Sequence, residues 1–263
     1  MYKIKIASGD FKFGLYWNSG VISEFLNNDI PIHLKTTGIS TLFPFFISKY
    51  KKNFFGKMLE FINSSKVLTR YFFKDNIYEK LYNQAITLWK LNRKKHFEFE
   101  SHKELQKEFK NYFGDIKIKD IGTFFQIETF DISKNEIYYF EPEDSYIDAL
   151  LASFSFPPFF KYHSYKGRNL IPTAEISLSP LRIEDIDVVT SLEGCLKLPI
   201  PKNAAEISLY SFFLRKKKLF DIITKDKDVL TPINPHSTSL SGASYNNAKK
   251  SAQLWIEKNM EVL

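Results

Sequence analysis

Gly38-Ile39-Ser40-Thr41-Leu42 is the stretch on which the interpretation of this chain depends. An apolar segment over residues 30–34 precedes it and predicts a strand, and the apolar run over residues 42–47 predicts the start of a helix. Gly38 permits a tight turn between the two, and Ser40 lies where such a turn exposes a nucleophile. The complete pattern has a second glycine at position 42, where this chain has leucine.

The length and composition indicate one sizeable domain. The chain has 263 residues, a 16% aromatic share and a single cysteine, Cys195. One cysteine excludes an intramolecular disulfide and indicates a reducing compartment. The sequence has no secretory leader pattern and no apolar run of about 20 residues, the length that a bilayer requires. We therefore expect a cytoplasmic protein, soluble or peripheral at the inner membrane surface.

The formal net charge is +7, and basic residues gather at positions 49–52, 93–95 and 215–218. Such clusters can meet anionic lipid or nucleic acid, and the plain alternative for each is a solvated face. No nucleic-acid-binding motif accompanies them, so nucleic acid is not an expected partner, whereas an anionic membrane surface is. The histidines are too scattered to predict a metal site, and no cofactor is expected.

Strand and helix patterns alternate along the chain, which predicts an α/β fold with a mostly parallel sheet covered on both faces. Strands are predicted over residues 2–6, 30–34, 187–191 and 230–233, a hairpin over residues 122–140, and helices over residues 20–27, 77–91, 103–113, 145–154 and 245–259. The helical stretch over residues 43–118 is too long for a simple crossover. We expect a single domain over residues 1–263 with this stretch as a helical cap or insert.

Three stretches, in order, resemble the patatin-like phospholipase family. The first, residues 7–15, is similar to the family's glycine-rich loop after the first strand, whose backbone N–H groups form the oxyanion hole. The resemblance implies this role for Gly9 and Gly14. Asp10 and Phe11 stand where the family has further glycines. The second stretch is residues 38–42, which implies Ser40 as the nucleophile and Gly38 as the elbow glycine.

The third stretch is the most extensive. Residues 125–140 and 147–160 are similar to the family's central hairpin, its Ala-Ser helix and the Pro-Phe segment after it, and residues 170–181 match the segment that carries the catalytic aspartate. The aspartate position is occupied by Pro172. The resemblance implies a patatin-like three-layer αβα sandwich with a helical insert after the nucleophile elbow. It also implies a serine lipid acyl hydrolase that acts on phospholipid or acyl-lipid esters.

The catalytic base is the weak point of this interpretation. In the family, an aspartate activates the serine without a histidine, and Pro172 offers no base. Glu175 is the nearest carboxylate in the sequence and the candidate substitute acid, and His163 is a second candidate base. The plain alternatives are a surface-loop charge for Glu175 and a strand-edge histidine for His163.

Two interpretations follow. In the first, the chain is an active lipid acyl hydrolase with a relocated carboxylate, and residues 49–55 and the aromatic-rich insert meet the lipid. In the second, it is a non-catalytic lipid- or protein-binding pseudoenzyme on the same fold. Because the base, the glycine-rich loop and position 42 all depart from the family pattern, we expect hydrolysis to be reduced or lost.

Overall fold

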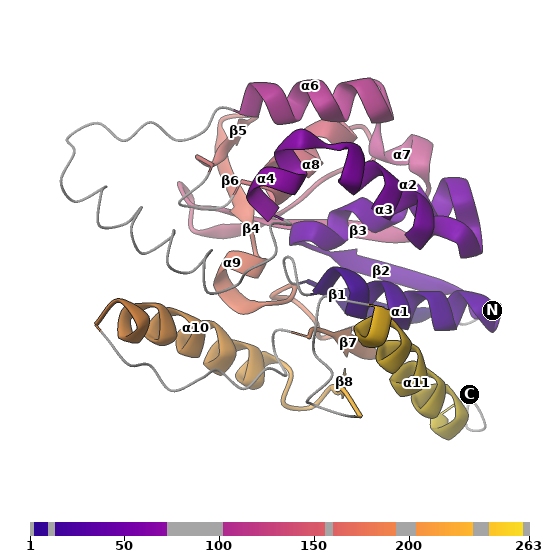
Figure 1. The fold of residues 1–263 in the computed structure, drawn as a ribbon. Coiled ribbons are helices and arrows are strands. Elements are labelled where there is room, and N and C mark those ends of the chain that lie inside the picture. Colours follow the sequence, from indigo (N-terminus) through magenta and orange to yellow (C-terminus); the bar gives the residue numbers. More distant parts are fainter. Residues whose placement is uncertain are drawn as a thin grey trace.

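The computed structural model describes residues 3–9, 14–72, 102–155, 160–192, 204–233 and 242–259 (Figure 1). The helix predicted over residues 77–91 lies outside these ranges, as do Asp10, Phe11 and Cys195.

The described strands form one mixed sheet in the order β5-β6-β3-β2-β1-β7-β8, with β4 paired to β3. The parallel strands are β1 (Ile4–Ser8), β2 (Ile32–Thr36), β3 (Phe125–Asp131), β7 (Val188–Thr190) and β8 (Asp228–Leu230). The antiparallel strands are β4 (Glu136–Tyr139), β5 (His163–Tyr165) and β6 (Arg168–Pro172). The parallel strands have a common carboxyl edge, where the loops that follow them converge.

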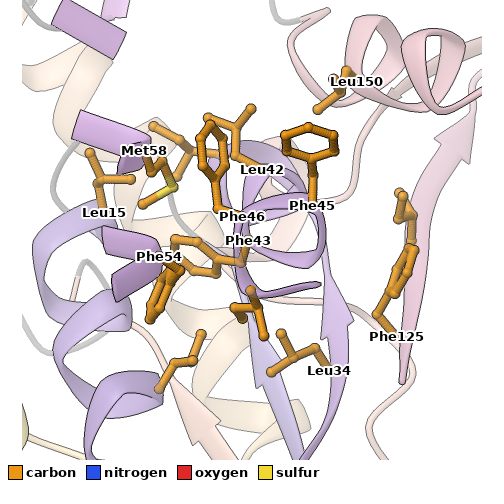
Figure 2. Packing of buried hydrophobic residues seen from close by; sticks show 14 of the residues in the cluster. Leu15, Leu34, Leu42, Phe43, Phe45, Phe46, Phe54, Met58, Phe125 and Leu150 are labelled. Carbon is orange, nitrogen blue, oxygen red and sulfur yellow. The ribbon is translucent and has the colours of Figure 1, made fainter. Parts of the chain in front are cut away.

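One face of the sheet carries the larger core. It is covered by α1 (Gly14–Asn27), α2 (Phe43–Tyr50), α3 (Phe54–Ser64), α6 (His102–Phe113), α8 (Tyr146–Ser153) and α11 (Gly242–Asn259). Figure 2 shows Leu34 of the sheet in one cluster with Phe54 and Met58 of α3. The described part of the 43–118 stretch, which also contains η2 (Lys51–Asn53), α4 (Lys66–Phe72) and α7 (Ile118–Ile121), therefore continues the main core. Its role as a cap stays a prediction.

The other face of the sheet carries a smaller core beneath α9 (Ala174–Ser177) and α10 (Ala204–Ile223). Ala7 and Val189 of the sheet pack there against Leu178 and against Phe220 of α10. Figure 1 shows α9 and α10 apart from α2, α3 and α6. Helices thus flank both faces of a mostly parallel sheet, and the predicted three-layer α/β/α architecture with a helical insert is confirmed.

The turn after β2 has the predicted strand-to-helix form. Gly38 adopts the left-handed conformation with a φ of 59°, which residues with a side chain rarely adopt. A 3₁₀ helix, η1 (Gly38–Leu42), follows and leads directly into α2. Pro44 lies in the first turn of α2, where a missing N–H costs nothing. Leu42 is fully buried in the larger core (Figure 2), so its side chain fills space instead of preventing the turn.

Several predicted boundaries are wrong. Helix α1 begins at Gly14 instead of at residue 20, and the strand placed over residues 230–233 is β8, which ends at Leu230. The first two strands each begin two residues later than predicted. The antiparallel strands β5 and β6 and the long helix α10 were not predicted.

We predict that Gly38→Ala lowers the free energy of unfolding by about 1–2 kcal/mol, because an L-residue in the left-handed region costs about that much. Chemical denaturation monitored by circular dichroism measures the effect. The matched control is Gly56→Ala in α3, where an added Cβ meets nothing within 4 Å and alanine favours the helix. Equal stability changes for the two variants would contradict a structural requirement at position 38.

Candidate functional site

Ser40 lies in η1 at the carboxyl edge of the parallel strands, next to the ends of β1 and β2. Its side chain is fully buried. Left-handed backbone occurs at Gly38 and not at Ser40. In a nucleophile elbow the serine itself occupies the sharp, strained turn and is exposed. The position of Ser40 after the strand therefore matches the motif, whereas its burial does not.

The Ser40 hydroxyl belongs to a buried hydrogen-bond network. It donates to the carbonyl oxygen of Gly9 at 2.8 Å and lies 2.8 Å from the hydroxyl of Ser8. The Asn18 side-chain amide donates both to Ser40 Oγ at 3.3 Å and to the Gly9 carbonyl at 3.0 Å. Thr190 at the end of β7 donates to Asn18 Oδ1 at 2.8 Å. The network thus joins β1, α1, η1 and β7.

This network uses the full hydrogen-bonding capacity of Ser40. A serine hydroxyl has one proton and two acceptor positions. The proton goes to Gly9, so Ser8 is the donor in its contact with Ser40, and Asn18 occupies the remaining acceptor position. The acceptor of the proton is a peptide carbonyl, which has no basicity near neutral pH. A general base must lie within hydrogen-bonding distance of the proton that it removes, and none of these partners is one.

Glu175, the candidate substitute acid, has a basic partner of its own. It lies in α9, and its carboxylate forms an ion pair with Lys216 of α10 at 3.1 Å. Lys216 Nζ also lies 3.4 Å from the carbonyl oxygen of Ala174. Glu175 is not among the hydrogen-bond partners of Ser40 described above. Its role as a catalytic acid stays a prediction.

The segment that contains Pro172 does reach the serine turn. Pro172 ends β6 and pairs with Thr129 of β3. Two residues later, the Ala174 N–H donates to the Thr37 hydroxyl at 3.4 Å. The aspartate position implied by the family resemblance is therefore close to the turn in space, but the chain has no carboxylate at that position.

Gly9 is closed in by backbone. A Cβ built on it would lie 2.5 Å from the Leu178 carbonyl oxygen and 2.6 Å from Ser179 Cα, so only glycine fits. Its carbonyl oxygen points at Ser40 and carries partial negative charge. An oxyanion hole instead presents N–H groups, which carry partial positive charge. Gly14 is the buried first residue of α1. The oxyanion-hole roles of Gly9 and Gly14 stay predictions.

A buried carboxylate on β3, Glu128, was missed in the sequence. It accepts hydrogen bonds from the Leu181 N–H at 2.5 Å and from the Tyr139 hydroxyl at 3.0 Å. Burial raises the pKa of the Glu128 carboxyl above its ordinary value, and these hydrogen bonds oppose that shift. Ile127 faces the larger core, so Glu128 points to the opposite face. Ser8 shares its face with Ile6 of the larger core, which separates Glu128 from the serine network.

His163, the second candidate base, belongs to a separate cluster. Its Nε2 lies 2.9 Å from Asp148 Oδ1, and its ring meets that of His102 edge-on at 5.7 Å. His102 Nε2 lies 2.8 Å from the Ser155 hydroxyl, and its ring stacks on Phe160. Burial, and then the neighbouring His163, lower the pKa of His102 to about 4. We interpret the cluster as packing between α6, α8 and β5.

Sequence reasoning found Gly38 and Ser40 but missed Ser8, Asn18 and Thr190. Each is a small, buried polar residue, and most of its partners are far away in the sequence. The available signal was a polar residue at a core-facing position, since Ser8 follows the buried Ile4 and Ile6 at alternating spacing.

Within the described ranges, no helix combines the length and apolar character that crossing a bilayer requires. The same ranges contain no group of three or more His, Cys, Asp or Glu side chains placed to hold a metal ion.

Comparisons with known proteins show a distant structural similarity. No family model and no curated protein matches the chain. Among solved structures, the chain is similar to VipD from Legionella pneumophila, with a TM-score of 0.45 and 11% sequence identity. The similarity covers 97% of this chain and 66% of that one, so the chain spans slightly less than two thirds of the VipD structure. We base no argument on it, and the fold rests on the strands and helices described above.

We predict that Ser40→Ala lowers the free energy of unfolding by about 1–3 kcal/mol, because the buried partners of the hydroxyl lose a hydrogen bond. Urea denaturation measures the change. The matched control is Ser164→Ala, at an exposed position on β5, with an expected change within about 0.5 kcal/mol. A stabilised Ser40→Ala protein would instead indicate a strained residue kept for chemistry.

We also predict a pH dependence that arises from His102. Its pKa is about 4 in the folded chain against 6.5 ordinarily, so the unfolded state binds more protons between these values. Stability then falls as pH is lowered from about 6.5 to about 4. Urea denaturation at several pH values should show a smaller fall for His102→Gln than for the unsubstituted protein. An identical fall in the free energy of unfolding of the two proteins would contradict a buried, neutral His102.

Proposed function

We propose that this chain is a non-catalytic, lipid-binding protein on a patatin-like scaffold, in which Ser40 is a structural hydroxyl. The scaffold part of the proposal is supported by the order of the three stretches that resemble the family and by the strand-turn-helix around Ser40. The loss of hydrolysis is supported by one observation above all. The Ser40 proton is donated to the Gly9 carbonyl in a fully buried network.

Three physical requirements of acyl transfer bear on the proposal. The nucleophile needs a base, and the hydrogen-bond partners of Ser40 are hydroxyl, amide and peptide carbonyl groups. The oxyanion needs donors, and the backbone group that faces Ser40 from the loop after β1 is the Gly9 carbonyl oxygen. The substrate needs access, and Leu178 and Ser179 pack directly on Gly9. Each change alone would slow an ester hydrolase, and together they favour a binding role.

The competing interpretation is an active lipid acyl hydrolase that uses Glu175 as a relocated acid. It requires Glu175 to leave its ion pair with Lys216 and Ser40 to leave its network. It also requires the backbone over Gly9 to open. These rearrangements oppose well-satisfied buried contacts, so we favour the non-catalytic interpretation.

We predict that a fluorophosphonate probe does not label Ser40 in the purified full chain. Labelling is measured on a gel and by mass spectrometry of the peptide that contains Ser40, with an active serine hydrolase labelled in parallel. Fatty-acid release from mixed phospholipid vesicles should be the same for the unsubstituted protein and for Ser40→Ala. Labelling at Ser40, or release that Ser40→Ala abolishes, would overturn the proposal in favour of a hydrolase.

A further inference from the structure

Helix α10 has an exposed stripe that the proposed function does not explain. It runs along one side of this 20-residue helix at spacings of three, four and seven residues, which place side chains on one face. Its members, here called the α10 stripe, are Ile207, Ser211, Leu214, Arg215, Lys218 and Ile222. The stripe combines three aliphatic side chains with two basic ones, and Asp221, three residues after Lys218, lies at its edge and forms an ion pair with Lys217.

The aliphatic members of the stripe are well exposed. Ile207 is 53% exposed, Leu214 45% and Ile222 59%. Scattered exposed aliphatic side chains are ordinary on a protein surface. Three of them along a single helix face, with cations between them, form a more specific arrangement.

The basic members of the stripe are available for binding. Within the described part of the chain, neither Arg215 nor Lys218 forms an ion pair with an acidic side chain. The nearby Asp221 is occupied by Lys217 at 2.7 Å. Lys216, by contrast, is buried and bonded to Glu175 on the other side of the helix. Among the described residues, Arg215 and Lys218 thus have no acidic partner, and they lie on the same face as the exposed aliphatic side chains.

The segment expected from the sequence to meet lipid is less suitable. Phe54 is fully buried, and Phe55 stacks on Tyr245 with ring centroids 4.6 Å apart. Lys52 forms an ion pair with Asp29 at 2.7 Å. Phe54 and Phe55 thus serve the protein's own packing, and the expectation that residues 49–55 meet the lipid stays a prediction.

We propose that the α10 stripe docks this protein on an anionic lipid bilayer. A helix that lies in the membrane interface buries aliphatic tips in the acyl boundary while flanking Lys and Arg side chains bind headgroup phosphates. The stripe has both features, and the net charge of +7 adds long-range attraction. This inference concerns a surface on the smaller-core side of the sheet, and it holds whether or not Ser40 reacts.

The test is co-sedimentation of the full chain with vesicles of phosphatidylcholine alone or mixed about 3:1 with phosphatidylserine, at about 50 mM and about 500 mM salt. We expect binding to the anionic vesicles at low salt and at least about tenfold weaker binding in the other conditions. The double variant Arg215→Glu/Lys218→Glu should bind at least about tenfold more weakly. Leu214→Ser/Ile222→Ser should bind about tenfold more weakly, because it removes apolar area from the interface.

Matched controls separate the effect of the stripe from the effects of net charge and of exposed apolar surface elsewhere. Lys107→Glu/Lys110→Glu on α6 changes the net charge by the same amount at exposed positions, and Leu254→Ser on α11 removes another exposed aliphatic residue. Both should bind within about twofold of the unsubstituted protein. Circular dichroism confirms that each variant is folded.

Three results would overturn the proposal. The first is that the protein does not bind anionic vesicles, and the second is that the stripe variants bind them as well as the unsubstituted protein does. The third is that the protein self-associates in solution and that Leu214→Ser/Ile222→Ser abolishes this association. The last result would assign the stripe to a second copy of the chain. None of these results bears on fluorophosphonate labelling at Ser40, so the proposed loss of hydrolysis and the proposed docking surface on α10 fail separately.

Discussion

The hydrogen bond from Ser40 to the Gly9 carbonyl is the contact on which the carboxyl edge of the sheet depends. It joins the turn after β2 to the end of β1, and Asn18 extends it to α1 and to Thr190 on β7. Buried polar groups are costly unless they are paired, so each member needs the others in place. In the function that we propose, the same complete pairing that stabilises this edge also withdraws the hydroxyl from chemistry.

The backbone that covers Gly9 completes the closure. Leu178 adopts a left-handed conformation with a φ of 61° although it has a side chain, and the Ser177 hydroxyl bonds to the Ser179 carbonyl at 2.9 Å. A strained residue persists only where its surroundings hold it. Here Leu178 is held by the smaller core, where it packs with Ala7 and Phe220. The tight approach to Gly9 is thus fixed by packing on the side of the sheet that carries α10.

Much of the fold could be predicted from the sequence, but little of the candidate site. Periodicity and turn residues identified the β3–β4 hairpin, α6 and β7, and the need for a left-handed residue identified Gly38. The strands β5 and β6 were missed because β5 has only three residues and β6 has its apolar residues side by side, so neither shows an alternating apolar pattern. The partners of Ser40 were missed because they lie in separate elements, and only the register of β1 with β2 and β7 brings them together. No local pattern encodes such a register.

The four basic residues at positions 215–218 are adjacent in the sequence but lie on different faces of α10. Successive side chains on a helix point about 100° apart, so four adjacent cations cannot share one surface. Lys216 faces inward and forms an ion pair with Glu175, the candidate substitute acid. Arg215 and Lys218 face outward beside Leu214. One run of charge therefore fastens α9 to α10 and also provides the two cations of the α10 stripe, the surface that we propose binds lipid.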